Sequence, residues 1–510
     1  MSLARRSREF PVRYRPPSAR ASAVPPSKNA ESRHGYLAPA VRSPVHRRSS
    51  RALVIGLDSV PPSLLFDRFL PLMPRVQELL SRSVYGTLLS TDPPITVPAW
   101  AVMFSGMDPG TLGLYGFRHR RPGTYWEMYL PTSRTPLQPL LWDRLSRIGK
   151  RVCVIGMPPG FPPPRVNGVY VSDFLTPNAS SEFVSPAELR EEVQRAAGGY
   201  EFDVTFRAED RDRVGAQLTQ MTRKHFAVAR HLWAKERWDF FALHEIGPDR
   251  IHHAFWKYFD PSHPRYEEHP KYRALVEDYY RMLDAEIGAL IDGVSEDVRV
   301  MLLSDHGSQA MAGGFCVNEW LIRQGHLTLE GPRPPPGTPI ESARVDWSRT
   351  RAWGAGGYYG RIFYNVKGRE PEGILSPEDV PAFEARLAAE FRAIQRPDGH
   401  LLEADPRSPR ELYREVRGDA PDLIVYFGNA TWRSLGTVGY DSLFLLENDS
   451  GPDDSVHSFE GIYSISGPSA GAGARGPAER IIDIGPTILD LMGVDVPPEL
   501  QGHVIGAFRA

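Results

Sequence analysis

Residues 52–59 read Ala-Leu-Val-Ile-Gly-Leu-Asp-Ser, an apolar run of strand length that ends directly in a carboxylate, Asp58. A second run, Val-Met-Leu-Leu-Ser-Asp-His-Gly at residues 300–307, has the same design. Apolar runs without polar alternation are typical of strands that are buried on both faces of a parallel sheet. The two stretches therefore predict an α/β fold with acidic side chains at the carboxyl ends of its strands.

The rest of the chain extends this pattern, because short apolar runs alternate with helix-length segments from Arg51 onward. This alternation predicts a mostly parallel sheet sandwiched by helices. The expected strands are 52–57, 84–89, 152–156, 240–244, 298–304, 423–427 and 462–466. Apolar residues at helical spacing predict helices over 213–236, 272–292 and 484–492.

Two stretches, 174–212 and 307–419, fit the alternation poorly. We expect them to be insertions at the carboxyl edge of the sheet, where ligands of open α/β sheets bind. The expected catalytic domain spans 51–510, and a basic leader precedes it. Residues 1–50 are rich in Arg, Ser and Pro and contain few acidic residues, so we expect this leader to be disordered.

Composition excludes several classes of protein. The 510 residues are 41% hydrophobic and 24% charged, as in folded globular chains. A net charge of -2 would not gather nucleic acid, so we expect no stable nucleic-acid partner. Cys153 and Cys316 lie in apolar runs, which excludes a disulfide framework. With no signal-like or membrane-spanning run, we expect a cytoplasmic protein, and the sequence leaves its oligomeric state open.

Six Asp and His side chains at the ends of expected strands or helices can form two metal sites. They are Asp58, Asp305 and His306 in one site, and Asp249, His253 and His457 in the other. Asp249 and His253 are four residues apart, so a helix that begins at Pro248 places both on one face. Asp58 alone is as well explained by a helix cap, and His457 alone by an ordinary loop. Three ligands per ion leave an open position, which is typical of catalytic sites.

Thr96 lies within Pro-Pro-Ile-Thr-Val-Pro-Ala-Trp, residues 93–100, at the start of an expected apolar helix. The positive end of a helix dipole and its unpaired N–H groups favour phosphate binding. A hydroxyl beside a cation can lose its proton and attack phosphorus. The ordinary alternative is a threonine that caps the helix. With two metal sites expected nearby, we favour Thr96 as the nucleophile.

The order of these motifs resembles the alkaline phosphatase superfamily. Within it, the chain is most similar to the type I phosphodiesterase and nucleotide pyrophosphatase branch, with its bacterial predicted phosphohydrolase/phosphomutase members. The shared phrases are Thr-Val-Pro-Ala-Trp (96–100), Pro-Gly-Thr-Leu-Gly-Leu-Tyr-Gly-Phe (109–117), Pro-Asp-Arg-Ile-His-His-Ala-Phe-Trp (248–256) and Asn-Val-Lys-Gly-Arg-Glu-Pro (365–371). The resemblance covers about residues 51–510 and leaves out the leader.

The resemblance implies two divalent cations, Zn²⁺ or in some branches Mn²⁺. It implies that one is bound by Asp249, His253 and His457, and that the other is surrounded by Asp58, Thr96, Asp305 and His306. One departure is that Ala99 stands where nucleotide pyrophosphatases have an Asn that contacts a phosphate oxygen. Another is that residues 96–100 lack the Cys/Ser-x-Pro-x-Arg motif of sulfatases, which argues against that activity.

We therefore expect a two-metal phosphohydrolase acting on a small-molecule phosphate ester, with a phosphodiester as substrate and a phosphothreonine intermediate at Thr96. A phosphomutase or phosphotransferase using the same metals is the alternative enzyme class. A non-catalytic metal-bound binding module is a third reading, and the full set of donors argues against it. Trp100, Asn365 and Arg369 are expected to contact the substrate, and Arg361 is a further candidate. A solvated strand edge explains the three polar residues about as well.

Overall fold

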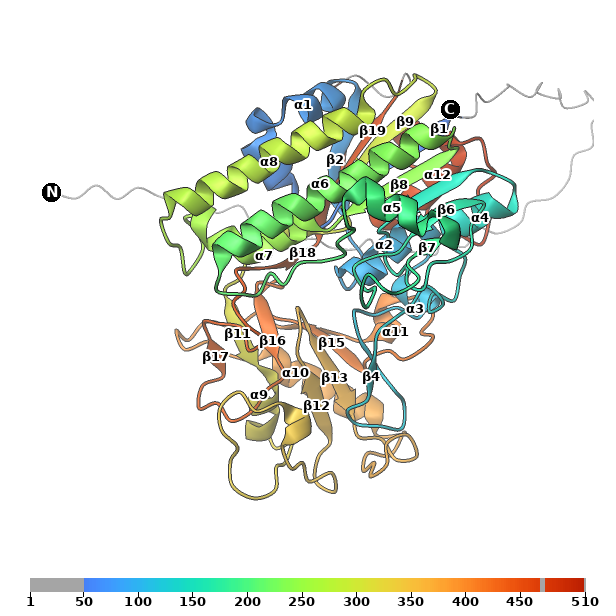
Figure 1. Ribbon diagram of the computed structural model, residues 1–510. Coiled ribbons are helices and arrows are strands. Elements are labelled where there is room, and N and C mark those ends of the chain that lie inside the picture. Colours follow the sequence, from blue (N-terminus) through green and yellow to red (C-terminus); the bar gives the residue numbers. More distant parts are fainter. Residues whose placement is uncertain (1–49, 468–472, 509–510) are drawn as a thin grey trace, which may run out of the picture. The chain divides into compact units, whose positions relative to one another are not determined.

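The computed structural model describes residues 50–467 and 473–508, so the leader expected over residues 1–50 lies, apart from Ser50, outside the described residues. Its central feature is a sheet of nine strands (Figure 1). In spatial order the strands are β20 (Glu479–Arg480), β2 (Ser83–Leu89), β19 (Glu460–Ser466), β9 (Val298–Leu303), β1 (Arg51–Leu57), β8 (Phe240–Glu245), β5 (Val152–Ile155), β6 (Gly168–Val171) and β7 (Val184–Ser185).

The strands around β1 all run in one direction. β1 pairs in parallel with β8 on one side and with β9 on the other, and β8, β5 and β6 continue the parallel arrangement. β19 runs antiparallel to both β9 and β2, and β7 runs antiparallel to β6. The sheet is therefore mostly parallel, as the sequence predicted.

Helices cover both faces of this sheet. Successive side chains of a strand point in opposite directions, so an apolar strand presents apolar side chains on both faces. Leu53, Ile55 and Leu57 of β1 belong to one core cluster, whereas Ala52 and Val54 belong to another. The first core includes residues of α1 (Pro74–Ser81), α6 (Arg211–Lys235), α7 (Gly247–Phe259) and α8 (Pro270–Ile291). The second includes residues of α2 (Thr96–Ser105), α4 (Leu141–Arg147) and α12 (Ile484–Leu491).

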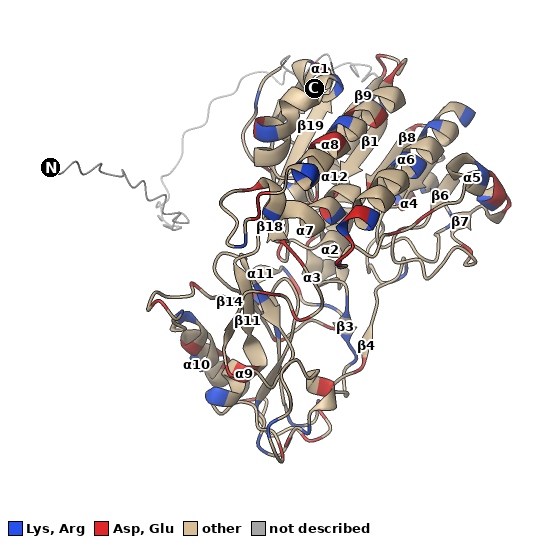
Figure 2. Cartoon of the chain, turned by 60° about the vertical axis from the view of Figure 1, so that its left-hand side comes forward, with Lys and Arg blue, Asp and Glu red and all other residues tan. Residues whose placement is uncertain are grey.

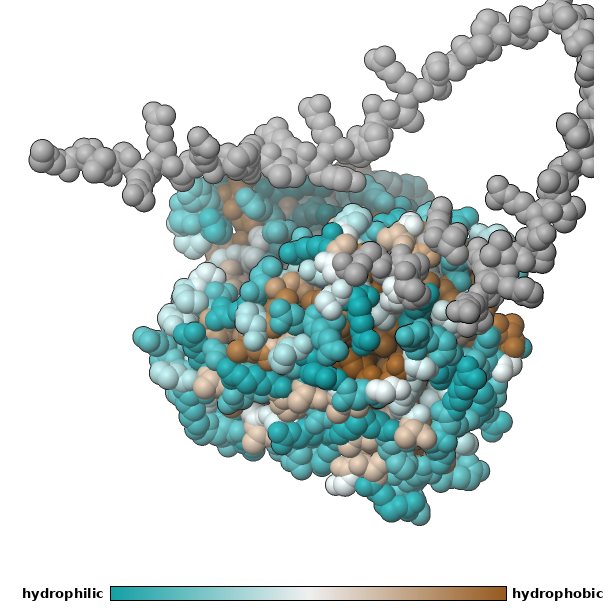
Figure 3. Space-filling view, turned by 90° about the horizontal axis from the view of Figure 1, so that it is seen from above, coloured by the Kyte–Doolittle hydropathy of each residue, from teal (hydrophilic) through white to brown (hydrophobic). Residues whose placement is uncertain are grey.

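The long helices agree with their sequence predictions to within two residues at each end. α6, α8 and α12 occupy the stretches expected at 213–236, 272–292 and 484–492. α8 carries both Lys/Arg and Asp/Glu, whereas the charged residues of α6 are almost all Lys and Arg (Figure 2). The view from above shows a largely hydrophilic surface with interspersed apolar side chains (Figure 3). Among the described residues, no helix combines the length and the apolar character needed to cross a bilayer.

The polypeptide between β9 and β18 (Ser455–Ser458) forms two small sheets with a core of their own (Figure 1). The four-stranded sheet contains, in order, β12 (Ala352–Ala355), β13 (Gly360–Tyr364), β15 (Leu423–Tyr426) and β14 (Asp405–Arg407). The three-stranded sheet contains β16 (Trp432–Leu435), β11 (Gly313–Cys316) and β17 (Phe444–Leu445). α9 (Val317–Arg323) and α10 (Val380–Arg392) contribute to this core.

One expected strand belongs to a different sheet from the one predicted. Residues 423–427 form β15, but β15 pairs antiparallel with β13 and β14 and takes no part in the nine-stranded sheet. Placing this strand in the parallel pattern was therefore wrong. An apolar run of four or five residues indicates a buried strand, but its partners depend on contacts that are distant in sequence.

Candidate metal centre

Three strand ends at one edge of the sheet position most of the site. Leu57 at the end of β1 pairs with Glu245 of β8, and Gly56 pairs with Leu303 of β9. The segments that follow these three strands therefore begin side by side. They contain Asp58 after β1, Asp305 and His306 after β9, and α7 after β8.

His457 reaches the same edge through a separate strand pair. β10 (Gly307–Ala310) directly follows Asp305 and His306 and pairs antiparallel with β18, which places Ser308 opposite His457. The imidazole rings of His306 and His457 stack with their centroids 3.9 Å apart. A loop histidine more than 150 residues away in sequence thus becomes a neighbour of the Asp-His pair.

Asp58, Asp305 and His306 form the first group of possible metal ligands, here called the β9 cluster. His306 Nε2 lies 3.1 Å from Asp305 Oδ2 and 3.8 Å from Asp58 Oδ1. All three residues are fully buried. Burial and the neighbouring carboxylate of Asp58 raise the pKa of Asp305 well above its usual range. A cation between the two carboxylates would remove this unfavourable proximity of like charges.

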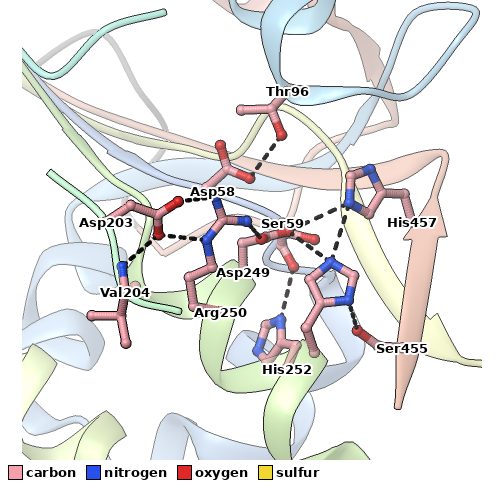
Figure 4. Close-up of polar contacts among 12 residues, drawn as sticks. Asp58, Ser59, Thr96, Asp203, Val204, Asp249, Arg250, His252, Ser455 and His457 are labelled. Atoms are coloured by element: carbon pink, nitrogen blue, oxygen red, sulfur yellow. Dashed lines mark hydrogen bonds and ion pairs between the residues drawn. The ribbon is translucent and has the colours of Figure 1, made fainter. Parts of the chain in front are cut away.

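Asp249, His253 and His457 form the second group, here called the α7 cluster. Asp249 Oδ1 lies 3.3 Å from His253 Nε2 and 3.4 Å from His457 Nε2, and the two nitrogens are 3.4 Å apart. The predicted spacing on a helix is therefore present in α7, which begins at Gly247. The contacts of Asp249 and His457 are drawn in Figure 4.

Each cluster contains one buried carboxylate oxygen without a hydrogen-bond partner among the described residues, namely Asp249 Oδ1 and Asp305 Oδ2. An unsatisfied buried oxygen is costly unless a cation or a donor compensates it. Both oxygens point toward the imidazole nitrogens of their own cluster. The donor set of carboxylates and imidazoles fits two divalent cations such as Zn²⁺ or Mn²⁺.

Trp100 and His244 hold Asp58 in place, and neither role was predicted. The indole Nε1 of Trp100 donates to Asp58 Oδ2 at 2.9 Å, and His244 Nε2 lies 2.8 Å from the same oxygen. Asp58 Oδ1 is left to face Thr96 and His306. The sequence signal for a polar role of His244 is its position at the end of a buried strand.

Ser59 makes the turn that directs the chain after β1, with a φ of 63°. Its backbone N–H donates to Asp305 Oδ1 at 3.2 Å, so the turn also orients the carboxylate of the neighbouring strand.

His252, adjacent to His253, has Nδ1 3.1 Å from the Ser59 carbonyl and Nε2 2.7 Å from the Tyr280 hydroxyl. Burial lowers its pKa to about 3, and it lies outside both clusters.

Asp453 orients the α7 cluster. Its Oδ1 lies 2.7 Å from His253 Nδ1, while its Oδ2 accepts hydrogen bonds from Arg207 and Arg433. A carboxylate on Nδ1 fixes the ring and leaves Nε2 as the nitrogen for a metal. Although burial opposes ionisation, the charges of His253 and the two guanidinium groups keep the pKa of Asp453 well below its usual range. This residue was missed because its only sequence signal is proximity to His457.

Thr96 is the first residue of α2, and its side chain does not cap that helix. Its hydroxyl lies 3.4 Å from Asp58 Oδ1 (Figure 4). The same hydroxyl lies 3.3 Å from His306 Nε2. The side chain is 1% exposed. The hydroxyl therefore faces the β9 cluster at the positive end of the helix, which is a suitable position for a nucleophile.

The side chains expected to contact substrate are otherwise engaged. Trp100 is fully buried beneath Asp58, so it does not face an ester group. The amide of Asn365 is buried and bonds to Trp347, Thr350, Glu372 and Tyr125. Arg369 pairs with Asp422 and Glu370.

The contact of these three residues with substrate stays a prediction. Asn365 and Arg369 bond to other residues of the inserted region. Arg361, the further candidate, donates to the backbone carbonyls of Arg118 and Gly356.

Residues 52–454 match the family model described as type I phosphodiesterase / nucleotide pyrophosphatase. The matched stretch contains every residue of the two clusters except His457, which lies three residues beyond it. No curated protein matches the chain.

Proposed function

Since this chain belongs to the type I phosphodiesterase / nucleotide pyrophosphatase family, whose members are metal-dependent phosphoric ester hydrolases, we propose that it hydrolyses phosphodiesters with Thr96 as nucleophile. The supporting observation is that the Thr96 hydroxyl faces two buried Asp/His clusters, each with an uncompensated carboxylate oxygen. The proposed ligands are Asp58, Asp305 and His306 for one cation, and Asp249, His253 and His457 for the other.

The proposed ions are Zn²⁺, with Mn²⁺ as the alternative, because mixed carboxylate and imidazole ligands suit both. When bound, two cations at these clusters would neutralise phosphoryl oxygens and lower the pKa of a neighbouring hydroxyl. Residues of the chain orient the nucleophile and bind the phosphate. Asp58 and His306 orient the Thr96 hydroxyl, and the start of α2 directs backbone N–H groups toward a bound phosphate.

The proposed reaction has two steps. Thr96 Oγ1 forms a bond to phosphorus while the bond to the leaving alcohol breaks, and water then hydrolyses the phosphothreonine. The substrate is proposed to be a small molecule in the cytoplasm, without a nucleic-acid partner.

The preference for diesters follows from the charge of the substrate. A diester phosphate carries one negative charge, whereas a monoester carries nearly two at neutral pH because its second pKa is about 6. Near the nucleophile, residues 97–100 offer no cation, and Arg361 and Arg369 are engaged in the inserted sheets. The guanidinium groups beside the α7 cluster, Arg207 and Arg433, share the carboxylate of Asp453.

Two measurements test the proposal. The first compares kcat/KM for bis-aryl and mono-aryl phosphates with one leaving group at equal metal and pH. A tenfold monoester advantage, about 1.4 kcal/mol, would contradict the diester preference.

The second measurement replaces the nucleophile. Thr96→Ala should lose nearly all activity while keeping its fold and metal content, and Thr96→Ser should retain a substantial part because the attacking oxygen survives. Wild-type turnover by a folded Thr96→Ala protein would rule out the phosphothreonine.

A further inference from the structure

Tyr358 brings a phenol from the inserted sheets into the α7 cluster. It lies between β12 and β13, and its hydroxyl is 3.1 Å from His253 Nε2. Its ring stacks on that of His457, with centroids 3.8 Å apart and an interplanar angle of 21°. The tyrosine therefore reaches the nitrogen that is proposed to bind a cation.

Two arginines from separate segments fix the phenol. Arg207, from the stretch before α6, donates from Nη2 to the Tyr358 hydroxyl at 3.1 Å. The guanidinium of Arg433 in β16 lies 4.4 Å from the centre of the phenol ring. Both arginines also bond to Asp453, which orients His253. The trio of Arg207, Arg433 and Asp453 has one net positive charge, so it favours negative charge beside the phenol.

The donors and acceptors at this point determine where the phenol hydrogen can go. A guanidinium only donates, so the Tyr358 oxygen accepts from Arg207 and keeps its own hydrogen for another acceptor. In the structure His253 Nε2 lies within hydrogen-bond distance of the hydroxyl, and which of the two atoms donates depends on the tautomer of the imidazole. Once His253 Nε2 serves as a metal ligand, it no longer accepts a hydrogen bond. The phenol hydrogen is then free for a substrate oxygen at the same place.

The position of Thr96 indicates which substrate oxygen this is. Thr96 contacts the β9 cluster, whereas Tyr358 contacts the α7 cluster. In an in-line displacement the leaving oxygen lies on the side of phosphorus opposite the nucleophile. That side faces the α7 cluster and Tyr358.

We propose that the Tyr358 hydroxyl, held by Arg207, donates a hydrogen bond to the leaving-group oxygen of the phosphodiester. As the bond from Thr96 Oγ1 to phosphorus forms, the leaving oxygen takes the electron pair of the breaking bond, and Tyr358 stabilises the resulting alkoxide. The inserted sheets thereby supply a donor for the leaving-group oxygen. This inference rests on the proposed function.

A cavity of about 390 Å³ shares Arg433 with the Tyr358 site, although no ligand of either cluster lines it. Arg433 lines it, together with Gly356 and Gly357, the two residues that precede Tyr358. Its size is within the range of ligand sites.

The test compares Tyr358→Phe with Tyr359→Phe. The first substitution removes the hydroxyl and keeps the stacked ring. Tyr359→Phe is the matched control, because the adjacent hydroxyl donates to the Tyr115 carbonyl instead. The substrates are methyl phenyl phosphate and methyl 4-nitrophenyl phosphate, which differ in how much help the leaving oxygen needs. Metal content is measured by elemental analysis, and orthovanadate binding by calorimetry, since vanadate mimics the five-coordinate transition state.

Tyr358→Phe should reduce kcat/KM about 100-fold with the phenyl ester, and clearly less with the 4-nitrophenyl ester. Vanadate binding should weaken about tenfold or more at unchanged metal content, and Tyr359→Phe should alter none of these. An equal loss for both esters, unchanged vanadate binding or a loss of metal would each overturn the assignment. Failure of the proposed function differs from all of these, because the wild-type protein would then not cleave either diester.

Discussion

Trp100→Phe tests whether Asp58 depends on the buried indole. The substitution removes the N–H that donates to Asp58 Oδ2 at 2.9 Å and leaves an aromatic ring in the core. Among the residues that the structure describes, His244 remains as the single partner of that oxygen, at 2.8 Å. Asp58 is fully buried, so water does not replace the lost donor. The carboxylate should therefore be less well oriented toward Thr96 and His306.

The expected magnitude follows from the kind of hydrogen bond that is lost. A hydrogen bond to a charged group contributes about 1.5–3 kcal/mol. At about 1.4 kcal/mol for each factor of ten, metal affinity at the β9 cluster should fall by roughly 10- to 150-fold. Affinity at the α7 cluster should stay within about threefold, because additivity generally holds for side chains without shared partners.

The assay is a titration of metal-free protein with Zn²⁺ in competition with a chromophoric chelator, which resolves sites of different affinity. Trp142→Phe is the control, because Trp142 is equally buried in the same core and packs against Phe104 and Tyr170. Both variants lose the same ring volume, so both should lose similar unfolding free energy. If Trp100→Phe binds Zn²⁺ as Trp142→Phe does, the orienting role of the indole is refuted.

Three further predictions concern the metals, a glycine of β1 and a buried ion pair. Exhaustive chelation should abolish hydrolysis, and Asp305→Asn and His457→Ala should each lower metal content as well as rate; full turnover of protein shown to be metal-free would contradict both clusters. Gly56→Ala should destabilise by about 1–3 kcal/mol, measured by denaturant unfolding, because the added Cβ would lie 2.5 Å from Trp100 Cη2; unchanged stability would show that the indole can move. Although burial opposes it, the Glu245 carboxylate 3.0 Å away raises the pKa of His225 above its ordinary 6.5, and His225 in turn holds the pKa of Glu245 below 4.5. The pair therefore stabilises the folded state fully between pH 4.5 and pH 6.5, and this stabilisation declines as pH rises through the folded pKa of His225. The difference in Tm between wild type and His225→Gln should therefore be larger at pH ~5.5 than at pH ~9. A Tm difference that grows as pH rises would contradict the expected direction.

The fold class was determined by local sequence alone. The apolar runs before Asp58 and Asp305 lack polar alternation, and such strands need helices on both faces. The candidate metal ligands could also be proposed from sequence, because Asp and His at strand ends and the i, i+4 pair in α7 are local patterns. These features depend on periodicity and on residue type, which a sequence displays directly.

The contacts of residues that act through a neighbour became clear only from the tertiary structure. Trp100 was expected to face substrate but lies beneath Asp58, and Asn365 and Arg369 serve the inserted sheets. Asp453 and Tyr358 were not anticipated, although each contacts His253.

The reason is that the direction of a polar side chain depends on which strands pair. The β10–β18 pairing brings His457 to the Asp-His pair, and the inserted strands carry Tyr358 to His253. Such pairings join segments more than 100 residues apart, so local patterns do not encode them.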